Sequence, residues 1–168
     1  MRRSWRHRWR LGWRCALGAV LVASCSGAGA ATGGVATVTA VVDGDTIDVR
    51  FGDRSERIRL VGIDTPETKK PGSPVECYGP EATAFLDDLL PIGTTVRVER
   101  DVVGRDDYGR VLGYVHLTDG TFVNLEIVRR GYARPLVIEP NDTFATEFAA
   151  AARSAESDDL GLWAACSP

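Results

Sequence analysis

The stretch VATVTAVVDGDTIDVRFGDRSERIRLVGI, residues 35–63, decides the fold. Apolar or small residues alternate with polar ones over 35–42, 46–51 and 56–63, which is the pattern of half-buried strands. Asp43-Gly44 and Gly52-Asp53 separate these runs, and both pairs favour turns. The stretch therefore predicts a β-meander of three strands.

The rest of the pattern adds two strands and three helices. Five short strands with a helix after the third are the order of an OB-fold barrel, so we expect an α+β protein built on a five-stranded OB-fold β-barrel with three helices. The two further strands are expected at 95–100 and 111–117. The helices are expected from Pro80 to about Pro91, over 122–128 before Gly131, and from an Asn141-Asp142 cap to about Glu156.

Residues 1–24 are expected to be a secretory signal peptide. An arginine-rich start precedes an apolar stretch, 15–23, that is shorter than the roughly 20 apolar residues of a membrane-spanning helix. Val22-Ala23-Ser24-Cys25 resembles the lipobox of bacterial lipoproteins, in which Cys25 would carry the lipid. Ala28-Gly29-Ala30 instead fits the cleavage site of a fully secreted protein. Either way we expect an exported protein, and we favour a lipid anchor at the outer face of the cell membrane.

The expected mature chain is acidic. Residues 25–34 are expected to form a flexible, small-residue spacer, and residues 35–166 are expected to form the folded domain. Removing residues 1–24 takes away six arginines and no acidic residue, which moves the formal net charge from −3 to −9. Tight nonspecific binding to nucleic acid relies on Lys and Arg. This balance therefore counts against a role in coating DNA.

Cys77 and Cys166 are expected to form a disulfide. Cys15 lies in the leader and Cys25 is the candidate lipidation site, so an even pair of cysteines remains in an exported chain. Two free thiols are the alternative. A metal site on the two thiolates is disfavoured, because His116 is the sole histidine after the leader.

The end of the third strand carries unusual charge. In Arg59-Leu60-Val61-Gly62-Ile63-Asp64-Thr65-Pro66-Glu67, an arginine opens an apolar strand and polar residues close it. Strand cores rarely carry charge, so these residues are placed for chemistry. A guanidinium and hard oxygen ligands suit a phosphate ester and a divalent metal. The alternative is a strand that leads into an Asp-Thr-Pro turn, with Arg59 and Glu67 simply solvated.

Two other motifs are commonplace by themselves. Asp43-Gly44-Asp45-Thr46 is typical of a type I′ turn, and Tyr108-Gly109-Arg110 opens the fifth strand. Together with residues 59–67, however, they resemble the thermonuclease (micrococcal nuclease-like) family over about residues 35–165. Further matching pieces follow in the same order and at similar spacing: Tyr78-Gly79-Pro80-Glu81-Ala82, Asp107-Tyr108-Gly109-Arg110, Val123-Asn124 and Gly161-Leu162-Trp163.

The resemblance implies a Ca²⁺ site. Asp45 and Asp64, with the backbone carbonyl of Thr65, would hold one Ca²⁺ ion through the hard oxygen ligands that it prefers. Asp43 would lie in the outer shell of the site, or it is a plain turn residue. Glu67 would orient or deprotonate the attacking water, and the sequence does not distinguish these two roles.

The resemblance also implies a phosphate site and a reaction. Arg59 and Arg110 would bind the scissile phosphate and stabilise the charge of the transition state. Tyr108 would contact the phosphate or sugar, or it is an exposed loop aromatic. The reaction would be the hydrolysis of DNA and RNA, single strands favoured, to 3′-phosphates and 5′-hydroxyls. We expect a monomer.

Two departures from the family pattern concern substrate binding. Asp107 stands where family members often have a lysine, and residues 134–141 lack the tyrosines that stack on a base. Base–aromatic stacking contributes about 1–3 kcal/mol per base. We therefore expect weaker substrate binding with an intact catalytic centre.

Two other classes of function compete with the nuclease. One is a non-catalytic OB-fold module that binds a polyanion, and the other is a Ca²⁺-stabilised structural lipoprotein. The first would usually lack some of the Arg or carboxylate positions that are all present here. The second would leave Arg59 and Arg110 without a purpose, so the nuclease is favoured.

Overall fold

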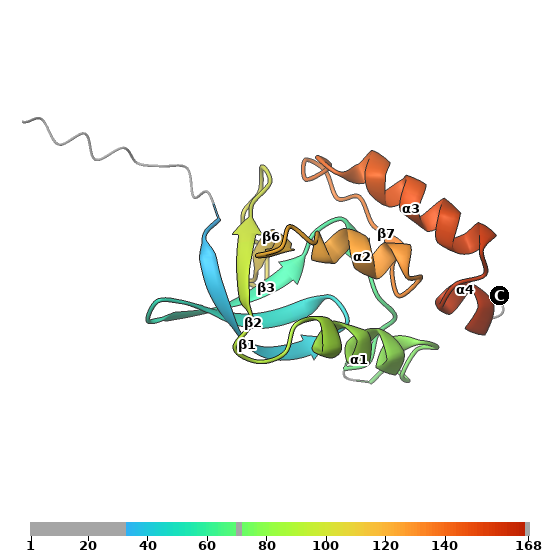
Figure 1. Cartoon of the computed structure of the whole chain (residues 1–168), viewed down its shortest axis with the longest axis horizontal. Coiled ribbons are helices and arrows are strands. Elements are labelled where there is room, and N and C mark those ends of the chain that lie inside the picture. Colours follow the sequence, from blue (N-terminus) through green and yellow to red (C-terminus); the bar gives the residue numbers. More distant parts are fainter. Residues whose placement is uncertain (1–32, 70–71, 167–168) are drawn as a thin grey trace, which may run out of the picture.

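A computed structural model of the chain describes residues 33–69 and 72–166. The expected signal peptide, Cys25 and most of the spacer lie outside the described residues. Within them, five strands close into a barrel in the order β1-β2-β3-β6-β5, with helices packed around it (Figure 1). The expected α+β fold, an OB-fold barrel, is thus confirmed.

The barrel strands are β1 (Val35–Asp43), β2 (Thr46–Phe51), β3 (Arg54–Leu60), β5 (Thr95–Glu99) and β6 (Val111–Leu117). The short strands β4 (Ile63–Asp64) and β7 (Arg134–Pro135) form a separate pair. The helices are α1 (Gly79–Leu89), α2 (Val123–Arg129), α3 (Ala145–Ser157) and α4 (Leu162–Ala165).

The β1–β2 hairpin turns at Gly44, where glycine is needed for space. Asp43 pairs with Thr46 across the turn. Gly44 does not have a positive φ angle, which a type I′ turn requires. The turn is therefore not of the type that Asp43-Gly44 typically forms. A Cβ at Gly44 would lie 2.8 Å from Thr65 Oγ1 and 3.0 Å from Ala82 Cβ. The glycine thus lets the hairpin approach α1 and the loop after β4.

The third predicted strand, 56–63, is divided in two. β3 ends at Leu60, and Gly62 then adopts φ 81°, a conformation that favours glycine. A side chain at Gly62 would also collide with the ring of Phe148. The chain leaves the barrel here, and Asp64 in β4 pairs with Arg134 in β7.

Strand β3 also pairs in parallel with β6, which places Arg59 opposite Leu112. The parallel pair closes the barrel. It also brings the end of β3 beside the start of β6, although about fifty residues separate them in the chain.

The three expected helices are present, and the short α4 was not expected. The last long helix begins at Ala145 with Phe144 as its N-cap, and the predicted Asn141-Asp142 cap is wrong. Asn141 is buried, and its side-chain oxygen accepts the N–H of Val103 (2.7 Å). Its amide nitrogen donates to the Val103 carbonyl (2.9 Å). The side chain is therefore used to hold the loop before β6 and is not available to cap a helix.

Helix α2 is joined to the barrel by a buried polar side chain. Asn124 is fully buried; its side-chain oxygen accepts the N–H of Val115 (2.9 Å), and its amide donates to the Val61 carbonyl (2.9 Å). Helix α3 packs on α2, and α1 packs on β1 (Figure 1). A buried amide that lost these partners would cost about 1–3 kcal/mol. The bond to the Val61 carbonyl therefore helps to fix the turn after β3.

A disulfide joins the loop before α1 to the end of the domain. Cys77 and Cys166 are bonded (S–S 2.11 Å) across 89 residues of sequence. Among the helices of residues 33–69 and 72–166, none combines the length and the hydropathy that a membrane-spanning helix needs.

Candidate active site

A polar cavity of about 330 Å³ opens where the β1–β2 turn, the end of β3 and the loop after β4 meet. Its wall combines five carboxylates with two arginines, and it includes all six residues that were predicted to bind metal or to catalyse. Tyr108 lines two adjoining cavities. The lining residues are Asp43, Asp45, Arg59, Asp64, Thr65, Pro66, Glu67, Glu76 and Arg110.

Asp45 is the buried acid of the cavity, only 7% exposed. Its Oδ1 accepts hydrogen bonds from Thr46 Oγ1 (3.1 Å) and lies 3.1 Å from Arg59 Nε. Its Oδ2 accepts the N–H (3.1 Å) and the Oγ1–H (3.0 Å) of Thr65. A buried carboxylate needs such partners. Asp45 thereby joins β2, β3 and the loop after β4.

The Arg59 guanidinium lies between the two predicted carboxylate ligands. Nη2 donates to Asp64 Oδ1 (3.1 Å), and Nε faces Asp45. Nη1 donates to the carbonyls of Leu60 and Ile63. The side chain is largely buried. The protein therefore fixes this guanidinium without help from a substrate.

Asp64 and Asp43 carry negative charge that the protein balances only in part. Burial raises the pKa of Asp64 against the lowering effect of Arg59, and neighbouring carboxylates raise it further. Burial also raises the pKa of Asp43, with the charge of Asp45 as the second cause. A cation near these groups would relieve both effects.

The donor chemistry of this region fits a hard divalent cation. No group of three or more His, Cys, Asp or Glu side chains in 33–69 and 72–166 is arranged to hold a metal ion. The predicted set contains only two carboxylates, Asp45 and Asp64, with the main-chain carbonyl of Thr65. Such a set suits Ca²⁺, which takes six to eight oxygen ligands and completes them with water or substrate.

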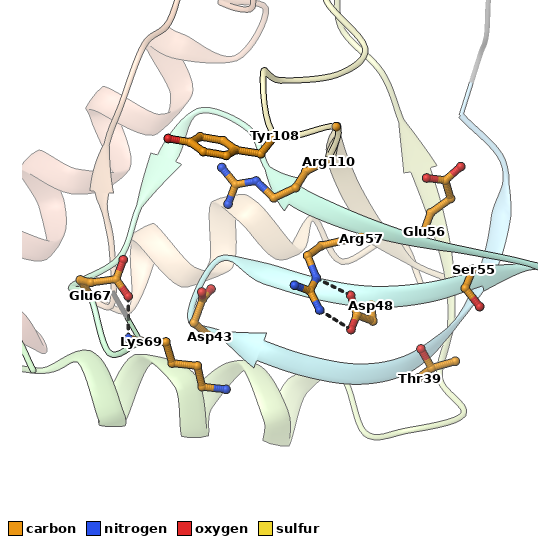
Figure 2. Close-up of a pocket in the computed structure, with 11 residues that line it drawn as sticks. Thr39, Asp43, Asp48, Ser55, Glu56, Arg57, Glu67, Lys69, Tyr108 and Arg110 are labelled. Atoms are coloured by element: carbon orange, nitrogen blue, oxygen red, sulfur yellow. Dashed lines mark hydrogen bonds and ion pairs between the residues drawn. The ribbon is translucent and has the colours of Figure 1, made fainter. Parts of the chain in front are cut away.

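Glu67 is held by its own loop. Its Oε1 accepts the N–H groups of Thr68 (2.8 Å) and Lys69 (2.7 Å). Its own N–H donates to Glu76 Oε2 (3.0 Å), and its carbonyl accepts the N–H of Glu76 (2.8 Å). Figure 2 shows Glu67, Asp43 and Arg110 around the same opening. The carboxylate is thus oriented before a substrate binds.

A tight turn around Asp106 directs Arg110 toward the cavity. Asp106 Oδ1 accepts the N–H groups of Tyr108 (3.0 Å) and Arg110 (2.9 Å), and Oδ2 accepts Arg110 Nε–H (2.7 Å). Gly109 supplies the φ of 79° that the turn needs. Because Nε bonds Asp106, the Nη1 and Nη2 end of the fork is the part that a substrate can reach.

Tyr108 is 86% exposed, and Arg110 Cζ lies 5.5 Å from the centroid of its ring (Figure 2). A cavity of about 470 Å³ on one side of this pair is lined by aliphatic residues that include Val103, Leu136 and Ile138. An open cavity of about 850 Å³ on the other side follows the outer face of β1–β3 (Figure 2). The cavity beside Tyr108 thus combines aliphatic side chains with charged ones such as Arg105 and Glu139.

A family model described as staphylococcal nuclease homologue matches residues 57–165. The chain belongs to this family. This confirms the resemblance that the motifs predicted. The chain is 40% identical over 126 residues to the thermonuclease of Staphylococcus intermedius, an alignment that covers 75% of this chain and 74% of that one.

Two further relatives are similar over a comparable part of this chain. The thermonuclease of Staphylococcus hyicus is 37% identical over 126 residues, which cover 75% of this chain and 73% of that one. Endonuclease YncB of Bacillus subtilis is 38% identical over 129 residues, which cover 76% of this chain and 60% of that one.

Sequence reasoning missed two residues that organise the site of this family member. Asp106 stands two residues before Tyr108 and four before Arg110, which is the spacing of a side-chain turn, so its role could have been found. Glu76 has no such local signal. The fold alone brings it to the cavity and to Glu67.

Proposed function

We propose that the protein is a Ca²⁺-dependent nuclease that hydrolyses DNA and RNA outside the cytoplasm. The observation that carries the proposal is the placement of Arg59, Glu67 and Arg110 around one cavity with Asp45 and Asp64. The relatives' names, thermonuclease and endonuclease, bear out the prediction of a nuclease.

Asp45, Asp64 and the carbonyl of Thr65 would hold Ca²⁺. When bound, the ion supplies positive charge that offsets the charge of the phosphate in the ground and transition states. Thr65 keeps Asp45 in place through its N–H and Oγ1. Asp43 Oδ1 accepts the N–H of Asp45 (3.2 Å) and so fixes the turn that presents it.

Arg59 and Arg110 would bind the scissile phosphate. Arg59 lies in β3, Arg110 directly precedes β6, the strand that pairs with β3, and both residues line the cavity. Planar guanidinium groups make charge-assisted hydrogen bonds to phosphate oxygens. Because negative charge grows on those oxygens in the transition state, the two arginines would stabilise the transition state more than the substrate.

Glu67 would hold the attacking water or accept its proton. The N–H groups of Thr68 and Lys69 fix its Oε1, which sets the direction of the carboxylate. Attack on phosphorus with cleavage of the bond to the 5′-oxygen would leave a 3′-phosphate and a 5′-hydroxyl. Tyr108 would contact the sugar or phosphate of a single strand, beside aliphatic residues that cannot stack as rings do.

We also propose that the protein acts outside the cytoplasm as a monomer anchored by lipid at Cys25. The arginine-rich start and the lipobox-like Val22-Ala23-Ser24-Cys25 support export. The Cys77–Cys166 disulfide suits an oxidising compartment. Cys25→Ser should release the protein into the medium, and unchanged retention on the membrane would contradict the anchor.

Cleavage of single-stranded DNA by the purified protein, with Ca²⁺ and then with EDTA, tests the activity. We expect cleavage that requires Ca²⁺ and that disappears in the double variant Glu67→Ala/Arg110→Ala. Arg130→Ala is the matched control, because Arg130 is also paired four residues away, with Glu126, but on the exposed face of α2. No cleavage with Ca²⁺, or full cleavage by the double variant, would overturn the proposal.

A further inference from the structure

The loop that carries Glu67 is closed by a reciprocal pair of hydrogen bonds to Glu76. The Glu67 N–H donates to the Glu76 carboxylate (3.0 Å), and the Glu76 N–H donates to the Glu67 carbonyl (2.8 Å). We name these two contacts the Glu67–Glu76 bridge. It spans nine residues and lies directly at the backbone of the residue that is proposed to act on water. The position of Glu67 thus depends on the position of Glu76.

Glu76 is itself fixed from the C-terminal side of the loop. The next residue, Cys77, is bonded to Cys166, the C-cap of α4. The Glu76 carbonyl accepts the N–H of Gly79, the first residue of α1 (3.1 Å). Gly79 also lies against the loop, since a Cβ there would be 2.9 Å from the Pro66 carbonyl oxygen. Glu76 is therefore held in two ways, by the disulfide of the next residue and by its hydrogen bond to the start of α1.

We propose that Glu76 is a positioning residue for Glu67, and that the Cys77–Cys166 disulfide holds Glu76 in place. The inference rests on the proposed role of Glu67. It gives the Glu76 carboxylate a role in the candidate active site, through the backbone N–H of Glu67. It also gives the disulfide a role in turnover in addition to stability. A misplacement of a reacting group by about 1 Å can cost about 100-fold in rate, so a backbone contact at Glu67 matters.

The alternative role for Glu76 is direct, as a metal ligand or a proton acceptor, because its side chain also lines the cavity. The two roles differ in what they need. A positioning residue needs only an oxygen that accepts the Glu67 N–H, which glutamine retains. A ligand or base needs the negative charge, which glutamine lacks.

The first test compares Glu76→Ala and Glu76→Gln in the full chain. At saturating Ca²⁺ we expect Glu76→Ala to lower kcat about 10–100-fold with little change in KM, and Glu76→Gln to restore most of the wild-type kcat. Glu81→Ala is the matched control, since Glu81 is an acid in the first turn of α1 that does not line the cavity. Equal losses in the Ala and Gln variants, or no loss in Glu76→Ala, would overturn the proposal.

The second test does not depend on activity. Amide hydrogen exchange of Glu67, measured by NMR without Ca²⁺, should be about tenfold faster in Glu76→Ala than in wild type, and near the wild-type rate in Glu76→Gln. An unchanged rate in Glu76→Ala contradicts the bridge even if the variant is inactive. If the wild type does not cleave DNA, the proposed function fails, while this measurement still decides whether Glu76 positions Glu67.

The third test is a double-mutant cycle between Glu76→Ala and Cys77→Ser/Cys166→Ser. If the disulfide acts through Glu76, Cys77→Ser/Cys166→Ser alone lowers kcat, and removing both lowers kcat no further than Glu76→Ala alone, because the same contact is lost. No loss in Cys77→Ser/Cys166→Ser alone would contradict a role of the disulfide in turnover. Losses that multiply would show that the disulfide acts elsewhere, and that part of the proposal would fall. Thermal unfolding of each variant confirms that the comparison is made between folded proteins.

Discussion

Arg59 Nε lies 3.1 Å from Asp45 Oδ1, and the two side chains are only 14% and 10% exposed. The same guanidinium donates to two main-chain carbonyls at the end of β3. Arg110 differs, since its ion pair with Asp106 is partly exposed, at 30% and 18%. The two arginines that share a proposed role in catalysis therefore have different roles in the fold.

Lysine at the two arginine positions should separate these roles. Arg59→Lys and Arg110→Lys are each expected to lower kcat by about 10³-fold or more, because the planar fork is lost. Arg59→Lys should also lower the free energy of unfolding by about 2–3 kcal/mol, since buried acceptors lose their donors. Arg110→Lys should change it by less than about 1 kcal/mol. Denaturant unfolding checks this, and equal destabilisation by both variants would contradict it.

Calcium should stabilise the wild-type protein. A ligand at about 100 times its Kd adds about 2.7 kcal/mol to the free energy of unfolding. We expect a higher midpoint of thermal unfolding with Ca²⁺, and little or no increase in Asp45→Asn and Asp64→Asn. Asp158→Asn, an exposed acid at the end of α3, serves as the control. A full Ca²⁺ shift in Asp64→Asn would exclude that residue as a ligand.

Gly44→Ala should disturb the metal site through Thr65. The added methyl group would meet Thr65 at 2.8 Å, which forces the hairpin and the loop after β4 apart. We expect a loss of about 1–3 kcal/mol in unfolding free energy and a weaker response to Ca²⁺. Gly34→Ala is the control, since its nearest contact would be an ordinary 3.6 Å to the Phe51 ring. A Gly44→Ala protein with wild-type stability would contradict the close approach.

Asp101 should make stability depend on acid pH. Its carboxylate accepts hydrogen bonds from Tyr114 Oη (2.7 Å) and Thr143 Oγ1 (2.9 Å). Burial alone would raise the pKa of Asp101, but these bonds and those from the N–H groups of Thr143 and Val102 outweigh it and lower the pKa.

Because the folded pKa lies below the unfolded value of about 3.9, this stability is present above that value and is lost as pH falls through the folded pKa. Asp101→Asn should therefore lower the thermal midpoint at pH ~7 and change it less at pH ~3. A difference between the two proteins that stays constant over this range would refute the assignment to the Asp101 carboxylate.

The barrel could be predicted from the sequence because its signals are local. Alternating residues mark β1 and β2, and glycine-containing turns separate them. The division of the third strand could not be predicted in the same way. Leu60 and Ile63 are both buried, so the pattern looks continuous, yet β4 pairs with β7 some seventy residues later. The Asn141-Asp142 cap was wrongly predicted for a similar reason, because the Asn141 side chain bonds the backbone of Val103, which is distant in the sequence.

The candidate site could also be predicted where its signals are local, and not where they depend on distant contacts. Asp45, Arg59 and Glu67 belong to motifs that can be recognised in the amino-acid sequence, and the fold brings them to one cavity. That Arg59 contacts both Asp45 and Asp64, however, depends on the register of β2 and β3 and on the turn at Gly62. Such contacts are a property of the closed barrel, and no short stretch of sequence contains them.

Strand β1 has a consequence for large substrates. It begins at Val35 and ends at Asp43, on the wall of the cavity, so at about 3.3 Å per residue it separates the two ends by up to roughly 26 Å. Figure 1 shows the chain entering β1 at the end of the barrel away from α1. A tether on the N-terminal side would thus join the domain at the end of β1 that lies away from the cavity. A long polymer that enters the cavity would then not meet the point of attachment.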